Sequence, residues 1–427
     1  MARPDRAVLA RKRFRTCPGP YAASLAGTGG RGWGRWERSD GSDSISLLAK
    51  SEAHVTTNSP VNGRTTNERG AVIVTGAAGF IGSHTVEALL ARGDHVIAID
   101  AFTSHYDPSR KRANLASVVA TAERLLRIGS PARLTFIEGD CGDGGTLARA
   151  FQAAEVISGV PATRVIHLAA RAGVRSPADQ APDYVHTNVV ATTAILEACR
   201  TRGFGLNAPD GALRGHLVIA SSSSVYGGGP PGWDGPLDEE MSADRPLSVY
   251  AATKRACELV AHAYSRTTGV RVTLLRFFTV VGPRARPDLT PSVFASAIRD
   301  GRPLTRFGDG TMARDYTYVG DTVTGILASL DRFDNASRGT VEPGEAYEVI
   351  NLGNDRPVSL AHYLETLGGL LDRTPVVSQV PIPPSEPYRT WANLTKARRL
   401  LGYTPTTSFE DALSHFVNWW IASQPSS

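Results

Sequence analysis

The pattern of apolar and polar positions changes abruptly near residue 70 of the 427-residue chain. Before that point no apolar spacing is sustained, and stretches such as 27–34 and 56–67 are polar or rich in glycine. From Ala71 an apolar run leads into a glycine-rich turn and then into apolar positions spaced along one helix face. We therefore predict a disordered basic extension over 1–69, with a transit peptide as the alternative, followed by a folded body.

Strand-like and helix-like segments alternate along this body. The segments between the apolar runs are long enough for helices, notably 182–202 and 247–267. Alternating β and α elements favour a parallel sheet that is covered by helices on both faces. We therefore predict an α/β fold with a Rossmann-like, doubly wound parallel sheet. The runs that predict its strands are 72–74, 96–99, 134–137, 164–168, 217–220 and 272–275.

The chain after Gly282 contains more proline and shorter elements. We predict a first domain over 70–282, to which 316–350 returns. A smaller, mostly C-terminal α/β domain over 283–315 and 351–427 is expected to bind the substrate.

Charge and composition exclude several classes of protein. The net charge is +5, but residues 1–70 hold 12 Lys and Arg against 6 Asp and Glu, leaving 34 against 35 elsewhere. A near-neutral body with a basic tail does not indicate nucleic-acid binding. No apolar run approaches the roughly 20 residues that span a bilayer, and no signal peptide is evident. Because the four cysteines are widely spaced, we expect no metal, no structural disulfide and a cytoplasmic location.

The first turn of the body suits a dinucleotide. It reads Gly76-Ala-Ala-Gly79-Phe-Ile-Gly82 between a strand and a helix, where small residues let the backbone approach a pyrophosphate. A tight turn without a ligand explains the glycines nearly as well. The next strand, however, ends in Asp100, whose carboxylate can bind the ribose 2′-hydroxyl and repel a 2′-phosphate, so NAD is favoured over NADP. The predicted cofactor-binding residues are Gly76, Gly79, Phe80, Ile81, Gly82, Asp100, Asp140, Cys141, Leu168, Ala169, Ala170, Tyr250 and Lys254.

Two polar residues at strand ends have competing interpretations. Asp140 can bond the adenine amino group or can cap a helix that starts near Gly144. His167 is more simply explained as a hydrogen-bonded core histidine than as a catalytic residue.

Tyr250 and Lys254 are one helical turn apart, so both side chains lie on one helix face. An ammonium group beside a phenol stabilises the phenolate, which makes the phenol a usable base. This spacing also occurs by chance in surface helices. A serine run that ends a strand upstream, residues 221–227, favours the catalytic interpretation, because ligands bind at that edge of such sheets.

From Ala71 to about Trp420 the chain resembles the extended short-chain dehydrogenase/reductase family of nucleotide-sugar enzymes, and most of all the UDP-glucuronate 4-epimerases. The glycine turn and the Tyr-Lys pair are typical of the whole superfamily, whereas Arg-Phe-Phe-Thr followed by Gly-Pro-x-x-Arg-Pro-Asp is far more selective. The matching segments are 75–84, 167–175, 184–188, 221–227, 250–254, 276–279, 282–288 and 313–317.

The resemblance implies NAD-dependent epimerisation at C4 of a UDP-sugar. Tyr250 would remove the 4-hydroxyl proton, Ser222 would hydrogen-bond the same oxygen, and Lys254 would support Tyr250. NAD⁺ would take a hydride from C4, and the resulting 4-keto sugar would rotate and receive the hydride on its other face, converting UDP-glucuronate to UDP-galacturonate. Members of this fold often form homodimers through two helices, for which 182–202 and 247–267 are the candidates.

A hexuronic acid carries a C6 carboxylate that is β to the 4-ketone and prone to leave as CO₂, so the site must hold it out of alignment. The resemblance assigns this task to Thr279 and the serine run, with three arginines available for acidic groups. A strand-end hydroxyl and solvated surface arginines remain as alternatives. The predicted substrate-binding residues are Arg175, Ser222, Ser223, Ser224, Thr279, Arg286 and Arg314.

Ser224 separates related activities. Sugar-nucleotide dehydratases and UDP-glucuronate decarboxylases carry an acid at this position, and a serine cannot remove a C5 proton as the dehydratases do. A UDP-glucose/UDP-galactose 4-epimerase, a decarboxylase and a non-catalytic NAD-binding module remain as alternatives. Three residues depart from the family pattern: Arg171 adds charge expected near the nicotinamide, Val281 removes a hydroxyl and is expected to relax substrate choice, and Gly320 replaces an acid.

Overall fold

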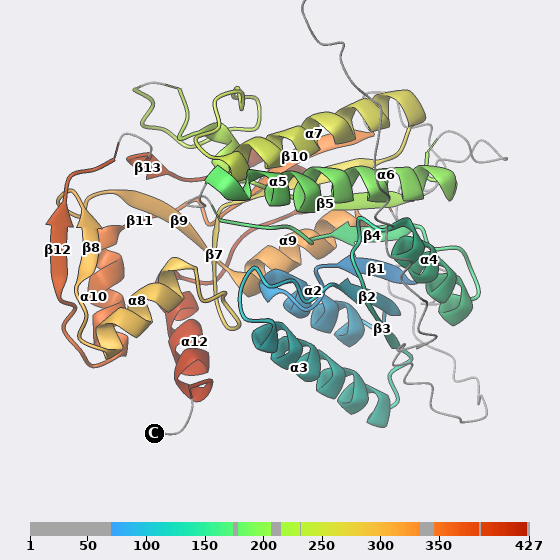
Figure 1. Cartoon of the computed structure of the whole chain (residues 1–427), viewed down its shortest axis with the longest axis horizontal. Coiled ribbons are helices and arrows are strands. Elements are labelled where there is room, and N and C mark those ends of the chain that lie inside the picture. The colour runs from blue at the N-terminus through green and yellow to red at the C-terminus, as the bar shows by residue number, and fades with distance from the viewer. Residues whose placement is uncertain are drawn as a thin grey trace, which may run out of the picture. The chain divides into compact units, whose positions relative to one another are not determined.

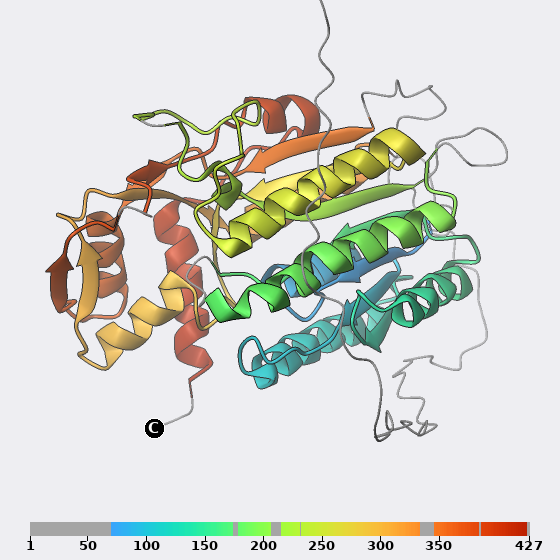
Figure 2. The same ribbon diagram turned by 45° about the horizontal axis from the view of Figure 1, so that its top comes forward.

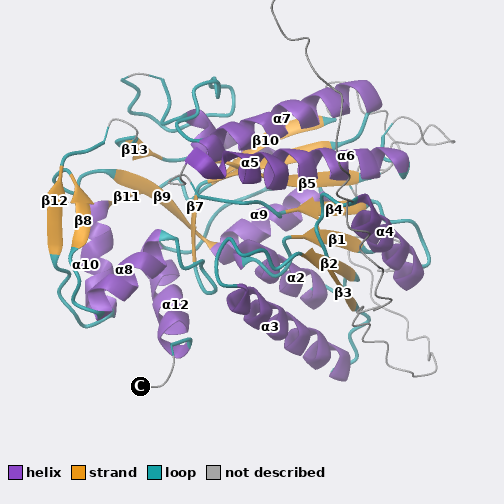
Figure 3. Cartoon of the chain, in the orientation of Figure 1, coloured by secondary structure: helices purple, strands orange, loops and turns teal. Residues whose placement is uncertain are grey.

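The structure is a computed structural model that describes residues 70–173, 178–205, 215–230, 232–333, 346–383 and 386–424. The predicted extension over 1–69 lies outside this range. Its centre is a sheet of seven parallel strands in the order β10-β6-β5-β4-β1-β2-β3, so the chain winds outward in both directions from neighbouring β1 and β4 (Figure 3). The doubly wound sheet is thus confirmed. Its strands are β1 Val72–Thr75, β2 Val96–Asp100, β3 Leu134–Glu138, β4 Arg164–His167, β5 His216–Ser222, β6 Val272–Phe277 and β10 Tyr347–Leu352.

Helices cover both faces of this sheet (Figure 1). Side chains of β1 alternate between them, because Val72 and Val74 join the apolar cluster under one helix layer and Ile73 joins the cluster under the other. The first layer comprises α2 Phe80–Ala91, α3 Pro108–Arg127 and α9 Val319–Asp331, and the second comprises α4 Gly144–Ser158, α6 Ala191–Thr201 and α7 Val249–Thr268. In Figure 2, α6 and α7 run side by side across their face.

The segment predicted as a single helix over 182–202 is interrupted. The short helix α5 Ala181–Tyr184 is followed by a wider π-helical turn, Val185–Val190, before α6 begins. At the centre of this turn lies Asn188, which is 1% exposed. π-turns occur frequently at functional sites, and the contacts of Asn188 described below explain this one.

A smaller mixed region lies beside the carboxyl end of the large sheet, on the left in Figure 1. One sheet runs in the order β11-β9-β13, with β7 also paired to β9, and β8 pairs with β12 in another. Buried aromatic rings such as Tyr316, Tyr363 and Phe409 pack together in its core. Its elements are β7 Thr279–Val281, α8 Thr290–Arg299, β8 Leu304–Phe307, β9 Ala313–Tyr318, β11 Pro357–Ser359, α10 Leu360–Leu370, β12 Val377–Val380, β13 Arg389–Thr390, α11 Thr395–Leu401 and α12 Phe409–Ala422.

Within the described ranges, no helix has both the length and the apolarity that crossing a membrane requires. The same residues contain no cluster of His, Cys, Asp and Glu suited to a metal ion.

Candidate active site

A cavity of about 520 Å³ opens at the carboxyl edge of the large sheet, against the smaller region. The sequence-predicted site residues that the structure describes all line this one cavity. Arg175 lies outside the described residues. The residues brought together are Gly76, Gly79, Phe80, Ile81, Gly82, Asp100, Asp140, Cys141, Leu168, Ala169, Ala170, Ser222, Ser223, Ser224, Tyr250, Lys254, Thr279, Arg286 and Arg314.

The glycine turn forms one wall of the cavity, where helix α2 begins. Gly76 has a φ of +68°, and a Cβ added there would lie 2.6 Å from the backbone nitrogen of Ala169. A side chain at this position would therefore be strained and would also push β1 away from the loop after β4. The bare backbone at a helix N-terminus fits the pyrophosphate of a dinucleotide.

Asp100 ends β2 and is 5% exposed. Its carboxylate accepts hydrogen bonds from the backbone nitrogens of Ala78 and Phe102 at 3.1 and 2.9 Å. Lys111 on α3 donates to it at 3.1 Å and also lines the cavity. The carboxylate is thus fixed where a dinucleotide ribose is expected, and the Lys111 ammonium group beside it is a cation that no sequence motif indicated.

Asp140 does not cap helix α4, so this alternative for the residue was wrong. Asp143 is the cap and accepts from the backbone nitrogen of Thr146 at 2.7 Å. Asp140 instead accepts from the backbone nitrogen of Gly142 at 2.7 Å and lines the cavity. The sequence alone cannot show which of the two aspartates caps the helix, because they are only three residues apart and either one suits an N-cap.

His167 is a core histidine, as expected. Its ring nitrogens lie 2.7 Å from Thr75 Oγ1 and 3.1 Å from Thr192 Oγ1. Burial lowers the pKa of His167 to about 3, with the charge of Lys254 acting in the same direction. The imidazole is neutral at physiological pH and does not line the cavity.

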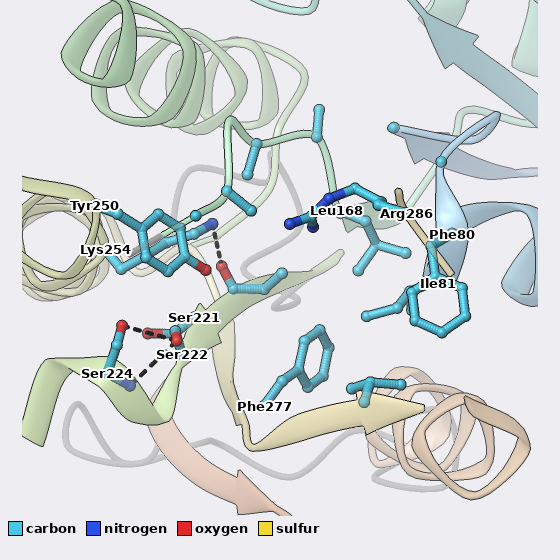
Figure 4. Close-up of a pocket in the computed structure, with 18 of the residues that line it drawn as sticks. Phe80, Ile81, Leu168, Ser221, Ser222, Ser224, Tyr250, Lys254, Phe277 and Arg286 are labelled. Carbon is cyan, nitrogen blue, oxygen red and sulfur yellow. Dashed lines mark hydrogen bonds between the residues drawn. The ribbon is translucent and has the colours of Figure 1, made fainter. Parts of the chain in front are cut away.

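Helix α7 presents Tyr250 and Lys254 to the cavity. Its start is fixed by Ser248, whose hydroxyl accepts from the backbone nitrogen of Ala251 at 3.1 Å. Lys254 is 4% exposed, and its Nζ donates to the carbonyl of Ala220 on β5 at 2.8 Å. Figure 4 shows the Tyr250 ring beside Lys254, with both directed toward the end of β5.

The serine run supplies the opposite side of this point. Strand β5 ends at Ser222, and a short 3₁₀ helix, Ser223–Tyr226, follows. Ser222 Oγ accepts from the backbone nitrogen of Ser224 at 3.2 Å and from Ser224 Oγ at 2.9 Å (Figure 4). Because both contacts use lone pairs, the hydroxyl hydrogen of Ser222 is left for an oxygen in the cavity.

Behind the serines, a buried ion pair joins α7 to the sheet. Arg276 on β6 donates to both carboxylate oxygens of Glu258 on α7, at 2.9 and 2.8 Å, and the two residues are 2% and 0% exposed. Ser221 donates to the same carboxylate at 2.6 Å. Burial acts to raise the pKa of Glu258, but the hydrogen bonds and charge of Arg276 outweigh it and lower that pKa. Arg276, part of the selective motif, therefore supports the site from behind.

Two of the predicted substrate-binding arginines form ion pairs with carboxylates and are not fully solvated. Arg286 donates to Asp288 through Nε and Nη2 at 2.9 and 2.8 Å, and its side chain is 18% exposed. Burial opposes its charge, but Asp288 outweighs burial and raises the pKa of Arg286. Arg314 pairs with Glu386 at 3.2 Å and is 23% exposed. The solvated-arginine alternative is wrong for both residues.

None of the three departures from the family pattern lines the cavity. Arg171 pairs with Asp183 at 3.0 Å and donates to Gln180 at 2.9 Å, so its charge is taken up by the segment around α5. Val281 is 0% exposed in the apolar core, and its neighbour Val280 lines the cavity instead. Among the described residues, Arg171 therefore makes no contact through which it could alter the nicotinamide side, and Val281 makes none through which it could relax substrate choice.

Gly320, the third departure, makes room for an aromatic ring. A Cβ at this position would lie 2.6 Å from the ring of Tyr318. An acidic side chain here would therefore displace that ring, which packs near His415.

Asn188, the last residue of the matching segment 184–188, supports the site from the π-turn. Its side chain accepts from the backbone nitrogen of Arg171 at 2.8 Å and donates to the carbonyl of Arg171 at 3.0 Å. It also donates to Thr253 on α7 at 2.9 Å. The π-turn thus links the loop after β4 to the helix of Tyr250. No local signal reveals this, because the contacts join distant segments.

A doubly wound sheet with a glycine turn, a carboxylate after β2 and a Ser-Tyr-Lys set at its carboxyl edge defines a dinucleotide-dependent enzyme of the α/β class. Residues 72–353 match the NAD dependent epimerase/dehydratase family, and the chain belongs to that family.

Individual members resemble the chain over most of its length. It is 39% identical to UDP-glucuronate 4-epimerase 4 of Arabidopsis thaliana over 364 residues, which cover 84% of this chain and 76% of that one. The UDP-glucuronic acid 4-epimerase of Bacillus cereus, solved with UDP-glucuronic acid and NAD, is 32% identical with a TM-score of 0.67, covering 82% of this chain and 99% of that one. A dTDP-glucose 4,6-dehydratase of Streptomyces venezuelae, solved with NAD, is 30% identical with the same TM-score of 0.67, over 83% of this chain and 97% of that one. Likeness of fold therefore does not separate epimerase from dehydratase.

Proposed function

We propose that this protein is an NAD-dependent UDP-glucuronate 4-epimerase that interconverts UDP-glucuronate and UDP-galacturonate. The observation that carries the proposal is the convergence of Ser222, Tyr250 and Lys254 at the end of β5, with Ser224 in place of an acid. When bound, NAD would supply reversible hydride transfer at C4 of the sugar, and because the hydride is returned to the sugar the reaction would have no net redox change. The glycine turn and Asp100 are the residues we assign to hold it.

The protein's own residues handle the proton. Tyr250 takes it from the 4-hydroxyl, while the Lys254 ammonium one helical turn away stabilises the phenolate. Ser222 donates its remaining hydrogen to the same sugar oxygen. Lys254 donates a hydrogen bond to the carbonyl of Ala220 on β5, the strand that ends in Ser222. This bond holds Tyr250 on helix α7 in a fixed position relative to Ser222.

The substrate's negative charges meet the cavity's arginines. We assign Arg286 and Arg314, together with Arg175, to the acidic groups of the UDP-sugar, because a guanidinium fork suits phosphate and carboxylate. Thr279 and the serine run are assigned to the sugar and its C6 carboxylate. Holding that carboxylate away from the carbonyl π system suppresses loss of CO₂ from the 4-keto sugar.

Ser224 argues against the dehydratase alternative, despite the structural likeness to such an enzyme. A dehydratase must remove a C5 proton, and a serine hydroxyl lacks the basicity for this step. Ser224 Oγ is moreover occupied as a donor to Ser222. A neutral-sugar 4-epimerase shares the same proton-handling set, so the substrate must decide between the two.

One assay tests the proposal. Purified protein is incubated with UDP-glucuronate without added NAD, and the sugar nucleotide is identified by NMR. UDP-galacturonate is expected; UDP-xylose would indicate decarboxylation instead. Equal turnover of UDP-glucose would show that the acid-specific assignment is wrong, and a substrate that stays unchanged even after NAD is added would refute an epimerase.

We propose that residues 70–282 and 316–350 bind NAD and that residues 283–315 and 351–427 bind the sugar nucleotide.

We further propose that the protein is a cytoplasmic homodimer. Exposed apolar side chains on the α5–α7 face support the dimer, including Val185 at 46% and Leu259 at 53% exposure. Among the residues that the structure describes, the three cysteines are free and buried, which fits a reducing compartment. Light scattering should give a dimeric mass that Leu259→Glu halves, whereas Val156→Glu on α4 should leave it unchanged.

A further inference from the structure

The turn that leads to Arg286 has an arginine where glycine is usual. In the turn from Gly282 to Ala285, the backbone nitrogen of Ala285 donates to the carbonyl of Gly282 at 3.3 Å. Pro283 is the second residue, and Arg284, the third, has a φ of +66°. This is the type II pattern, whose third position favours glycine because a Cβ is strained there. Backbone strain of this kind persists only where surrounding contacts enforce it.

The Arg284 side chain makes such a contact. Its two terminal nitrogens donate to the two carboxylate oxygens of Glu87 on helix α2 at 2.8 and 2.9 Å. The paired side chains are only 15% and 20% exposed, and the bidentate geometry fixes direction as well as distance. Thr121 on α3 donates to the same carboxylate at 3.2 Å. The turn is therefore tied to two helices of the NAD-binding side.

A second contact joins the same helix to the same turn. His84 Nε2 lies 3.0 Å from the carbonyl of Pro283, and because a carbonyl only accepts, this nitrogen carries the hydrogen. Burial lowers the pKa of His84, which keeps the ring neutral. Phe80, one turn earlier on α2, lines the cavity. One face of α2 thus contacts both the cavity and the turn.

We propose that Glu87 and Arg284 form a positioning pair that sets Arg286 in the cavity. Neither residue lines the cavity, so the pair acts through the turn, whose backbone continues directly into Arg286. The inference rests on the proposed function, because it assigns Arg286 to the sugar nucleotide. It also makes helix α2, which begins at the glycine turn, a common support for cofactor and substrate residues.

The Arg284→Gly substitution separates the effect of the side chain from the effect of backbone strain. Glycine relieves the strain at this φ while it removes the guanidinium. We expect the KM for UDP-glucuronate to rise about tenfold, kcat to change by less than about threefold and bound NAD to stay stoichiometric. Glu87→Gln should act in the same direction. If the arginine serves only the fold, the glycine variant will keep the wild-type KM, and that result would overturn the proposal.

A double variant tests whether the pair acts through Arg286. In an Arg286→Ala background, where calorimetry replaces turnover as the readout, Arg284→Gly should weaken UDP-glucuronate binding no further. A renewed tenfold loss there would show that Arg284 acts elsewhere. Lys396→Gln is the matched control, because it breaks a pair with Glu348 of similar exposure, 20% and 21%, between residues that do not line the cavity. An inactive wild type would refute the proposed function, whereas an active wild type with unmoved variants would refute this inference alone.

Discussion

Replacing Glu258 with glutamine removes the charge that neutralises Arg276 behind the serine run. The guanidinium is 2% exposed, so water cannot replace the lost partner. Breaking a buried pair on one side costs about 3–5 kcal/mol, and the amide still accepts one hydrogen bond, so we expect the lower end, about 3 kcal/mol. For a fold of this size this corresponds to roughly 4 °C in Tm.

The pH dependence of this loss has a defined sign. The pKa of Glu258 is lowered from 4.5 in the folded protein, so the ion pair contributes fully above that ordinary value and is lost as the pH falls through the folded pKa. Thermal melts of wild type and Glu258→Gln should therefore differ most near neutrality and converge in acid. Arg200→Gln is the control, because it breaks a pair that is 37% and 45% exposed and should cost less than about 1 kcal/mol. Coincident melting of wild type and Glu258→Gln at neutral pH would refute the reasoning.

Three further substitutions test the chemistry. Tyr250→Phe should abolish turnover while NAD, measured by release and chromatography, stays bound; undiminished activity would rule out the proposed base. Gly76→Ala should yield protein without NAD, because its Cβ would meet the Ala169 backbone at 2.6 Å, and full NAD content would contradict this. Ser222→Ala should lower kcat about 10- to 100-fold with little change in KM, so a change confined to KM would reassign it to binding.

Six of the seven strands of the large sheet, the glycine turn and the proposed catalytic set were readable from the sequence because each depends on local spacing. Asp100 and Ser222 end strands whose apolar runs are evident, and parallel strands deliver their carboxyl ends to one edge of the sheet. Tyr250 and Lys254 share a face through helix geometry alone. These rules suffice to bring distant residues into one cavity without knowledge of any tertiary contact.

The residues that support this set could not be found in the same way. Lys111 on helix α3 donates to Asp100 at the end of strand β2, and Arg284 pairs with Glu87, which is 197 positions away in the chain. The neighbouring sequence also does not show where an arginine side chain points. The predicted cavity residue Arg286 lines the cavity, whereas Arg171 forms an ion pair with Asp183. Long flexible side chains are placed by partners that only the folded chain supplies.

The residues that depart from the family pattern therefore lie in the surrounding scaffold rather than among the side chains that line the cavity. Val281 fills the apolar core and Arg171 joins the segment around α5, so neither offers a contact through which the reaction could change. Ser224 and Thr279 do line the cavity, and we therefore expect substrate choice to depend on them. Because a cavity-facing hydroxyl can be exchanged without repacking the core, this division lets related activities arise on one scaffold, consistent with epimerases and a dehydratase sharing its fold.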